Sequence, residues 1–206
     1  MRSSNAFEEA LVYAARVHAG QRRKGSDTPY IAHLLAVTAI ALDHGATENE
    51  AIAALLHDAV EDQGGQETLE EIHRRFGDQV ARIVAACSDT DEIPKPPWRE
   101  RKEAFVWRLR TEPYSVRLVV AADKLHNVRD VLNSYRVQGE DLWSHFNGRR
   151  DGTLWYYRAV VDALVGAAKP GENRLQAIID EIDRTLAALQ QLMAEQDRTA
   201  PAKGIS

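Results

Sequence analysis

Residues 55–62 read LLHDAVED. Two leucines come first, and two pairs of polar residues follow, separated by an alanine and a valine. Side chains three or four positions apart lie on the same face of an α-helix. Glu61 is therefore expected over His57 and Asp58. Asp62 is expected over Asp58 for the same reason. The stretch predicts a helix that starts inside the protein and presents one imidazole and three carboxylates on a single face.

This acidic face has two interpretations. Carboxylates that are packed together repel one another unless protons or a cation offset their charge, and a divalent metal does this well. Imidazole with carboxylate suits Mn²⁺, Fe²⁺ or Zn²⁺. The alternative is a solvated helix end without a ligand. Acidic residues are unfavourable at a helix C-terminus because of the macrodipole, so residues that work against local stability favour a functional site.

Two other segments carry candidate ligands. Residues 21–33 place a basic loop before a helix whose first turns contain His33. Residues 121–130 place Asp123 at the end of an apolar run, where a buried carboxylate requires a cation to offset its desolvation. The alternatives are a charged surface loop beside a packed His33, and a structural salt bridge at Asp123.

Helix start and stop signals dominate the rest of the chain. Capping boxes recur, for example at Thr47 with Glu50 and again at Thr68 with Glu71. The apolar run 116–122 contains strand-forming residues, but it continues without a break into a further helical pattern, which favours a buried helix. The sequence predicts an all-α bundle of about nine helices, at residues 5–20, 28–45, 47–64, 68–76, 78–87, 98–110, 116–132, 152–168 and 172–196, with loops at 88–97 and 136–150.

Length and composition narrow the class of protein. The 206 residues fit one domain, which we place at residues 1–196, with a flexible tail at 197–206. A net charge of −5 disfavours a dedicated nucleic-acid binder, although a local basic pocket for a small anion is compatible with it. No apolar run approaches the ~18–20 residues of a membrane span, and the N-terminus lacks a secretory signal. The single cysteine, Cys87, fits a reducing cytoplasm.

Several motifs agree, in order, with one group of enzymes. A histidine, then a His-Asp pair, then a distant aspartate resembles the HD-domain metal-dependent phosphohydrolases. More narrowly, the chain resembles the hydrolase domain of RelA/SpoT proteins and the stand-alone small alarmone hydrolases. The similarity covers residues 5–135, and its motifs are residues 18–24, 29–33, 55–62, 76–77 and 123–127.

The resemblance implies a helical bundle that removes pyrophosphate from the 3′ position of guanosine tetra- or pentaphosphate, usually with Mn²⁺. It implies metal ligands at His33, His57, Asp58 and Asp123. It implies a catalytic acidic pair at Glu61 and Asp62, and substrate contacts at Arg23, Lys24 and Asn127. The expected partner is a small nucleotide, with neither nucleic acid nor membrane, and the sequence leaves the oligomeric state open.

Two other functions stay open. Residues 134–151 carry no motif of the alarmone hydrolases, so one alternative is an HD phosphohydrolase that acts on a nucleoside monophosphate or on NADPH. The other is a catalytically silent helical module that binds a nucleotide, although all six proposed metal and acidic residues are present. An aromatic cluster within residues 143–157 is expected to pack in the core or, alternatively, to stack on a purine. His18 and His126 are expected to support their neighbours rather than to bind metal.

Overall fold

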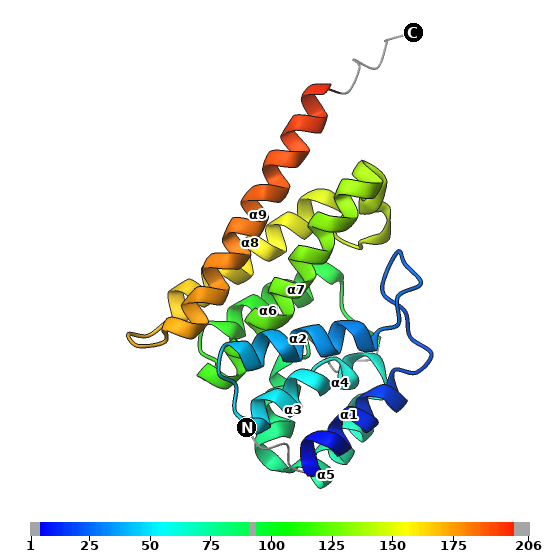
Figure 1. Cartoon of the computed structure of the whole chain (residues 1–206), viewed down its shortest axis with the longest axis vertical. Coiled ribbons are helices and arrows are strands. Elements are labelled where there is room, and N and C mark those ends of the chain that lie inside the picture. Colours follow the sequence, from blue (N-terminus) through cyan, green and yellow to red (C-terminus); the bar gives the residue numbers. More distant parts are fainter. Residues whose placement is uncertain (1–4, 91–93, 200–206) are drawn as a thin grey trace.

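The computed structural model describes residues 5–90 and 94–199, and this part of the chain confirms the all-α bundle (Figure 1). Its only β-type pairing is an isolated bridge between Arg22 and Pro29. The helices are α1 (Asn5–Val17), α2 (Ile31–Asp43), α3 (Glu48–Leu56), α4 (Ala59–Asp62), α5 (Gly65–Cys87), α6 (Trp98–Leu109), α7 (Tyr114–Gln138), the 3₁₀ helix η1 (Gly139–His145), α8 (Arg149–Ala167) and α9 (Asn173–Thr199).

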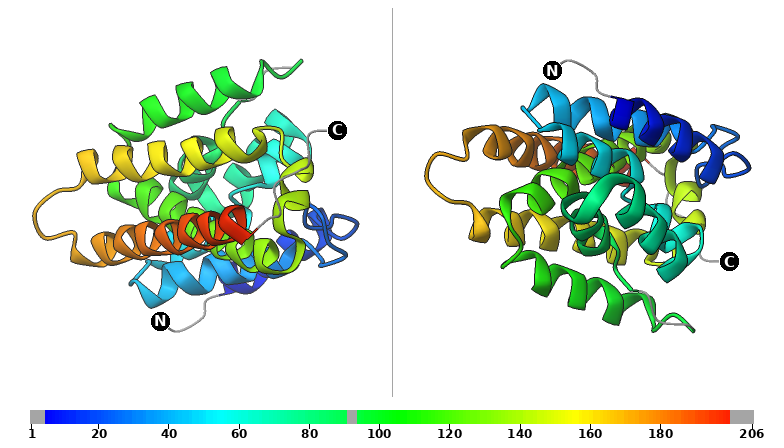
Figure 2. Two further views of the ribbon diagram at one scale, coloured as in Figure 1. Left: turned by 90° about the horizontal axis from the view of Figure 1, so that it is seen from above. Right: turned by 90° about the horizontal axis from the view of Figure 1, so that it is seen from below.

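Helix α7 forms the centre of the bundle. It packs against α2, α3 and α5 and also against α8 and α9. Figure 1 shows α1, α3 and α5 gathered at one end of the molecule, with α8 and α9 at the other, and Figure 2 shows the same bundle from above and below. The apolar run 116–122 lies wholly within α7 and is buried, which confirms the prediction of a buried helix rather than a strand.

Helix α9 closes the bundle with one apolar stripe. Every third or fourth side chain along it is buried: Leu175, Ile178, Ile179, Ile182, Leu186, Leu189 and Met193. The helix continues through Thr199, beyond the predicted end at Gln196, and residues 200–206 lie outside the described part of the chain. No helix among the described residues is both long and apolar enough to span a membrane.

The predicted helix 47–64 is interrupted in the middle. Its start is as expected, because Thr47 and Glu50 form a reciprocal capping box. Its continuity is not, because α3 ends at Leu56 and α4 begins at Ala59. The Nδ1 atom of His57 bonds to the carbonyl oxygen of Ala54, 2.9 Å away, and so competes with the backbone for that acceptor. The break therefore lies at the His-Asp pair itself.

The predicted boundary at Thr68 is wrong. Helix α5 begins at Gly65, and the Thr68 hydroxyl donates to the carbonyl oxygen of Gln63 instead of capping a new helix. The predicted division near residue 77 survives as a kink. Gly77 has φ 85°, a left-handed conformation that glycine adopts without steric cost, and it lies between two helical segments.

Two predicted segment ends also shift. Helix α2 begins at Ile31 rather than at Thr28, because Arg23 N donates to the carbonyl oxygen of Thr28 and draws that residue into the preceding loop. The predicted polar loop 136–150 is largely helical. Helix α7 extends to Gln138, η1 follows, and the buried Trp143 anchors that short helix.

Candidate active site

The four predicted ligands come from three parts of the fold and meet at one point. The Nε2 atom of His57 lies 3.0 Å from Asp58 Oδ2 and 3.6 Å from Asp123 Oδ1. The Nε2 atom of His33 lies 3.4 Å from Asp58 Oδ2 and 3.3 Å from Asp123 Oδ1. Ligand atoms of His33, His57 and Asp58 all lie within 4.8 Å of one another, a spacing that one metal ion could bridge.

The hydrogen bonds of the two histidines leave this cluster suited to bind a cation. Both Nε2 atoms are buried and have no well-formed hydrogen bond within the described residues, although they face the carboxylates. The Nδ1 atom of His57 is occupied by the Ala54 carbonyl. The Nδ1 atom of His33 lies 2.8 Å from Nδ1 of His126. An imidazole that donates through one nitrogen leaves the lone pair of the other nitrogen for a metal.

His126 is suited to accept a hydrogen bond from the Nδ1–H group of His33. Burial, together with the nearby His33 and Arg23, lowers the pKa of His126 to about 4. Its ring is therefore neutral near pH 7, and we assign its Nδ1 as the acceptor. His126 thus lies against Nδ1 of His33, whereas Nε2 of His33 faces the carboxylates of Asp58 and Asp123.

The cluster attracts positive charge. Burial alone would raise the pKa of Asp58, but His57 and His33 lower it well below its usual range. Burial likewise opposes ionisation of Asp123, while Lys124 and the two histidines lower its pKa well below its usual range. Burial would lower the pKa of His57, but the charge of Asp58 and contacts with Asp123 raise it well above the ordinary value. A proton on His57 and a divalent cation would thus compete for the same carboxylates.

Tyr30 completes the surroundings of Asp58 and was not singled out from the sequence. Its hydroxyl donates to Asp58 Oδ2 at 2.6 Å. Its ring stacks on the buried His18 with centroids 5.2 Å apart. The only sequence signal was that Tyr30 stands within one of the matching motifs, three residues before His33.

Asp62 belongs to a separate hydrogen-bonded chain. Gln21 donates from Nε2 to Asp62 Oδ2 at 2.7 Å, and the Oε1 atom of Gln21 is held by His18 at 2.6 Å and by Gln63 at 2.8 Å. Loss of solvation and then the charge of Asp58 raise the pKa of Asp62, while the bond from Gln21 opposes that rise. A carboxylate with a raised pKa holds a proton more readily than an ordinary one, which suits it to proton exchange.

Glu61 faces two cations. Its Oε1 atom lies 3.3 Å from Lys95 Nζ and 3.9 Å from a guanidinium nitrogen of Arg101. Although the helix is interrupted, the backbone N–H of Asp62 still donates to the carbonyl oxygen of Asp58, so α4 keeps the predicted one-turn offset between these residues. Asp58, Glu61 and Asp62 all line the same cavity.

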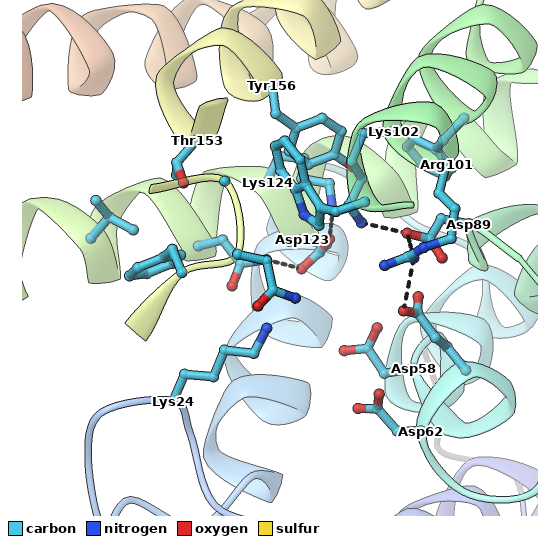
Figure 3. Close-up of a pocket in the computed structure, with 18 of the residues that line it drawn as sticks. Lys24, Asp58, Asp62, Asp89, Arg101, Lys102, Asp123, Lys124, Thr153 and Tyr156 are labelled. Atoms are coloured by element: carbon cyan, nitrogen blue, oxygen red, sulfur yellow. Dashed lines mark hydrogen bonds and ion pairs between the residues drawn. The ribbon is translucent and has the colours of Figure 1, made fainter. Parts of the chain in front are cut away.

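The three predicted substrate contacts are also brought together. Arg23 donates to Asn127 Oδ1 at 2.9 Å and to Asp130 Oδ2 at 2.8 Å. Asn127 in turn donates to Asp123, which links this group to the proposed metal ligands. Lys24 lies beside them on the loop between α1 and α2 and points into the cavity (Figure 3).

The cavity has a volume of about 470 Å³ and a strongly charged lining. Its cationic side chains come from the α1–α2 loop, the residues before α6, α6 itself and α7, and they include Arg23, Lys24, Lys95, Arg101, Lys102 and Lys124. Figure 3 shows Asp58 and Asp62 on one side of the cavity, with Lys24 and Lys102 approaching from different elements. The cavity therefore combines an acidic, metal-type cluster with walls suited to phosphate.

One part of this lining, a group of ion pairs, was not predicted from the sequence. Asp89 is bonded by both Arg101 and Lys102, and Lys124 is bonded to Asp123. These residues come from a loop and two helices, and only tertiary packing brings them together. Within the aromatic cluster, Tyr156 and Tyr157 line the cavity while being largely buried, so they pack in the core and also form part of the cavity wall.

Comparisons with known proteins agree with this geometry. The family model described as an HD domain matches residues 10–154. The guanosine-3′,5′-bis(diphosphate) 3′-pyrophosphohydrolase MESH1 of Homo sapiens is 42% identical over 182 residues, which make up 86% of this chain and 95% of that protein. The protein of the same name from Danio rerio is 41% identical over 176 residues, 84% of this chain and 92% of that protein.

A solved structure supports the same relationship. It is described as a metazoan ortholog of SpoT that hydrolyzes ppGpp, and it superposes with a TM-score of 0.72 at 32% sequence identity. The superposition covers 89% of this chain and 97% of that one, so it includes nearly the whole bundle.

Proposed function

The chain belongs to the HD-domain family of metal-dependent phosphohydrolases, and on that basis we propose that it is a guanosine 3′,5′-bis(diphosphate) 3′-pyrophosphohydrolase. The observation that carries the proposal is an imidazole–carboxylate cluster that opens into a cationic cavity, in a chain 42% identical to an enzyme of that name. The products would be GDP and pyrophosphate. A nucleotide substrate and a single cysteine also fit a cytoplasmic protein.

The substrate explains the arrangement of charge. A guanosine with a diphosphate at each end is highly anionic, whereas the whole chain has a net charge of −5. Cationic side chains that are clustered on part of a cleft wall produce a local positive field, and such a field can bind this ligand despite the overall balance. The cationic walls of the cavity supply that field.

His33, His57, Asp58 and Asp123 are the residues we propose as metal ligands. We propose Mn²⁺ as the ion, because imidazole and carboxylate suit it and because the family resemblance implies it. A divalent cation held by these residues would lower the pKa of water at the site and so would make a nucleophile available at neutral pH. His126 and the Ala54 carbonyl hold the two imidazoles with their Nε2 atoms toward Asp58 and Asp123, the orientation in which both could bind a metal.

Asp62 is the group we propose to carry the proton. The attacking water forms a bond to the phosphorus that carries the ribose 3′ oxygen. The bond from that phosphorus to the ribose oxygen breaks, and its electron pair stays on the ribose oxygen, which gains a proton. Asp62 accepts the proton of the water and returns one to the ribose oxygen, while Glu61 orients the water.

Arg23, Lys24 and Asn127 are the proposed substrate contacts. Asp130 and Asn127 hold the Arg23 guanidinium in place at the cavity edge. A guanidinium matches phosphate oxygens in pairs, and an ammonium acts as a point charge, so Arg23 and Lys24 would stabilise the charge that develops on the phosphate. Asn127 would bond the ribose or a phosphate from the same face.

Product analysis tests the proposal. The purified protein with Mn²⁺ is incubated separately with the guanosine bis(diphosphate), with NADPH and with nucleoside monophosphates, and the products are separated by anion exchange. We expect GDP and pyrophosphate from the first substrate, in equal amounts, and little turnover of the others. Orthophosphate from another nucleotide, with no turnover of the guanosine bis(diphosphate), would instead assign the protein to a different phosphohydrolase reaction.

A further inference from the structure

Three cations meet on one wall of the cavity, next to the proposed metal ligands. Arg101 and Lys102 come from α6, and Lys124 comes from α7. The ammonium groups of Lys102 and Lys124 both lie over the ring of Tyr156, 4.9 Å and 5.4 Å from its centroid. Figure 3 shows these side chains converging beside Asp89 and Asp123.

The carboxylates nearby do not balance these charges. Asp89 accepts hydrogen bonds from both Arg101 and Lys102. Lys124 bonds Asp123, but Asp123 also faces His33 and His57 in the proposed metal cluster. Arg101 also lies 3.9 Å from Glu61, but Glu61 pairs with Lys95 as well. Four cations, these three and Lys95, therefore share three carboxylates, and one of these, Asp123, also faces the proposed metal cluster.

Burial raises the electrostatic cost of this excess positive charge. The side chains of Arg101, Lys102 and Lys124 are only 10%, 17% and 14% exposed, respectively. Water screens such groups poorly, and like charges over one aromatic ring repel one another. A wall of this kind is stabilised when an anion enters the cavity and supplies the missing negative charge.

We propose that Arg101, Lys102 and Lys124 form the subsite for the distal phosphate of the reacting 3′-diphosphate, the phosphate that leaves as part of pyrophosphate. This inference rests on the proposed function and adds the part of the site that distinguishes a diphosphate from a single phosphate.

The location of this subsite favours the distal 3′ phosphate over the phosphates at the 5′ end as its ligand. Lys124 bonds the proposed metal ligand Asp123, and Arg101 lies 3.9 Å from Glu61, so the subsite borders the reacting centre directly. The phosphorus under attack lies at that centre, and the distal phosphate is one bridging oxygen away from it. Arg23 and Lys24 lie on a different element of the cavity, where they would contact the attacked phosphate and the rest of the nucleotide rather than the distal phosphate.

Product inhibition tests this subsite. The inhibition constants for pyrophosphate and for GDP are measured separately at constant free Mn²⁺, with the wild-type protein and with Lys102→Gln. We expect the variant to raise the inhibition constant for pyrophosphate by roughly 10- to 100-fold, the size expected for a lost bond to a charged group, and to leave that for GDP unchanged. Lys102→Arg, which keeps the charge, should restore inhibition by pyrophosphate.

Arg99→Gln is the matched control. Arg99 lies on the same helix one turn earlier, is half exposed, and pairs with Glu103 outside the cavity. It should leave both inhibition constants unchanged. If Lys102→Gln fails to fold, as judged by circular dichroism, Arg101→Gln replaces it with the same expectation.

Two results would overturn the inference. Weaker inhibition by GDP, with inhibition by pyrophosphate unchanged, would place the 5′ phosphates on this wall. No change in either constant would mean that Arg101 and Lys102 serve only to neutralise Asp89. If the wild-type protein does not hydrolyse the guanosine nucleotide at all, the proposed function fails first. Pyrophosphate binding to the same variants is then measured by calorimetry, where equal affinities would reject the subsite by itself.

Discussion

Gln21, in the loop after α1, donates a hydrogen bond from Nε2 to Oδ2 of Asp62, 2.7 Å away. The other end of its amide is fixed, because Oε1 accepts from the buried His18 and from Gln63. A carboxamide held in this way can present only its NH₂ group to Asp62. The loop that carries Arg23 and Lys24 therefore also orients the acidic residue that we propose to carry the proton.

Removing this amide should change the chemistry more than substrate binding. We expect Gln21→Ala to lower kcat by roughly 10-fold or more, a fraction of what a positioned proton-transfer group contributes, with KM little changed. The bond from Gln21 lowers the pKa of Asp62, so its loss raises that pKa. Since the proposed mechanism uses Asp62 as a carboxylate, the acid limb of the kcat–pH profile should move to higher pH.

The control for this change is Gln66→Ala, on the exposed surface of α5, where the side chain donates a hydrogen bond to Glu70. Its profile should match that of the wild type. A Gln21→Ala enzyme with an unshifted acid limb would remove Gln21 from the proton pathway.

Tyr30 should matter for metal affinity. Its hydroxyl donates to Asp58 Oδ2 at 2.6 Å, and groups that orient metal ligands in this way typically contribute roughly 10- to 100-fold to affinity. We expect Tyr30→Phe to weaken Mn²⁺ binding by about that factor, measured by competition with a chromophoric chelator. Unchanged affinity would show that Asp58 keeps its position without the hydroxyl.

Metal binding should release protons. Contacts with Asp58 and Asp123 raise the pKa of His57 well above its ordinary value, so the imidazole is protonated near neutral pH when no cation competes. A metal ligand must be the neutral imidazole, so binding expels this proton, and metal affinity should fall as the pH is lowered. Calorimetry in two buffers of different ionisation enthalpy measures the number of protons released. Identical heats in both buffers would contradict the assignment of His57 as a ligand.

The contact between α6 and α8 should be sensitive to a single methyl group. A Cβ atom on Gly148 would lie 2.6 Å from the ring of Trp98 and 3.0 Å from the backbone nitrogen of Thr153. Overpacking of this kind costs about 1–3 kcal/mol, so we expect Gly148→Ala to lower the free energy of unfolding by that amount in a denaturant titration. Gly166→Ala, near the end of α8, has open space around its Cβ and should be neutral or stabilising. Equal stability of the two variants would contradict this packing.

Local sequence signals predicted the features that depend on neighbours along the chain. The capping box at Thr47 and Glu50 is present, and the run 116–122 is a buried helix because it continues into α7. The His57-Asp58 pair could be recognised because both of its members stand in one short motif. Convergence with His33 and Asp123 was implied only by the family resemblance, because no periodicity relates three separate segments.

The wrong predictions have physical causes that a local sequence pattern does not show. Thr68 resembles a helix cap, but the chain turns earlier and its hydroxyl bonds Gln63 instead. The polar appearance of residues 136–150 concealed Trp143, which is buried and anchors η1. The wall formed by Asp89, Arg101 and Lys102 depends on how α6 packs across the cavity, a tertiary relationship that spacing along the chain does not reveal.

The most direct test of the account joins metal content to turnover in one titration. Protein freed of metal with a chelator is titrated with Mn²⁺, and bound metal and hydrolysis of the guanosine bis(diphosphate) are measured at each step, for the wild type and for Asp123→Asn. We expect bound metal and hydrolysis to rise together and to saturate at one ion per chain, and we expect the variant to lose both. Full hydrolysis by metal-free protein, or full metal occupancy in Asp123→Asn, would contradict it.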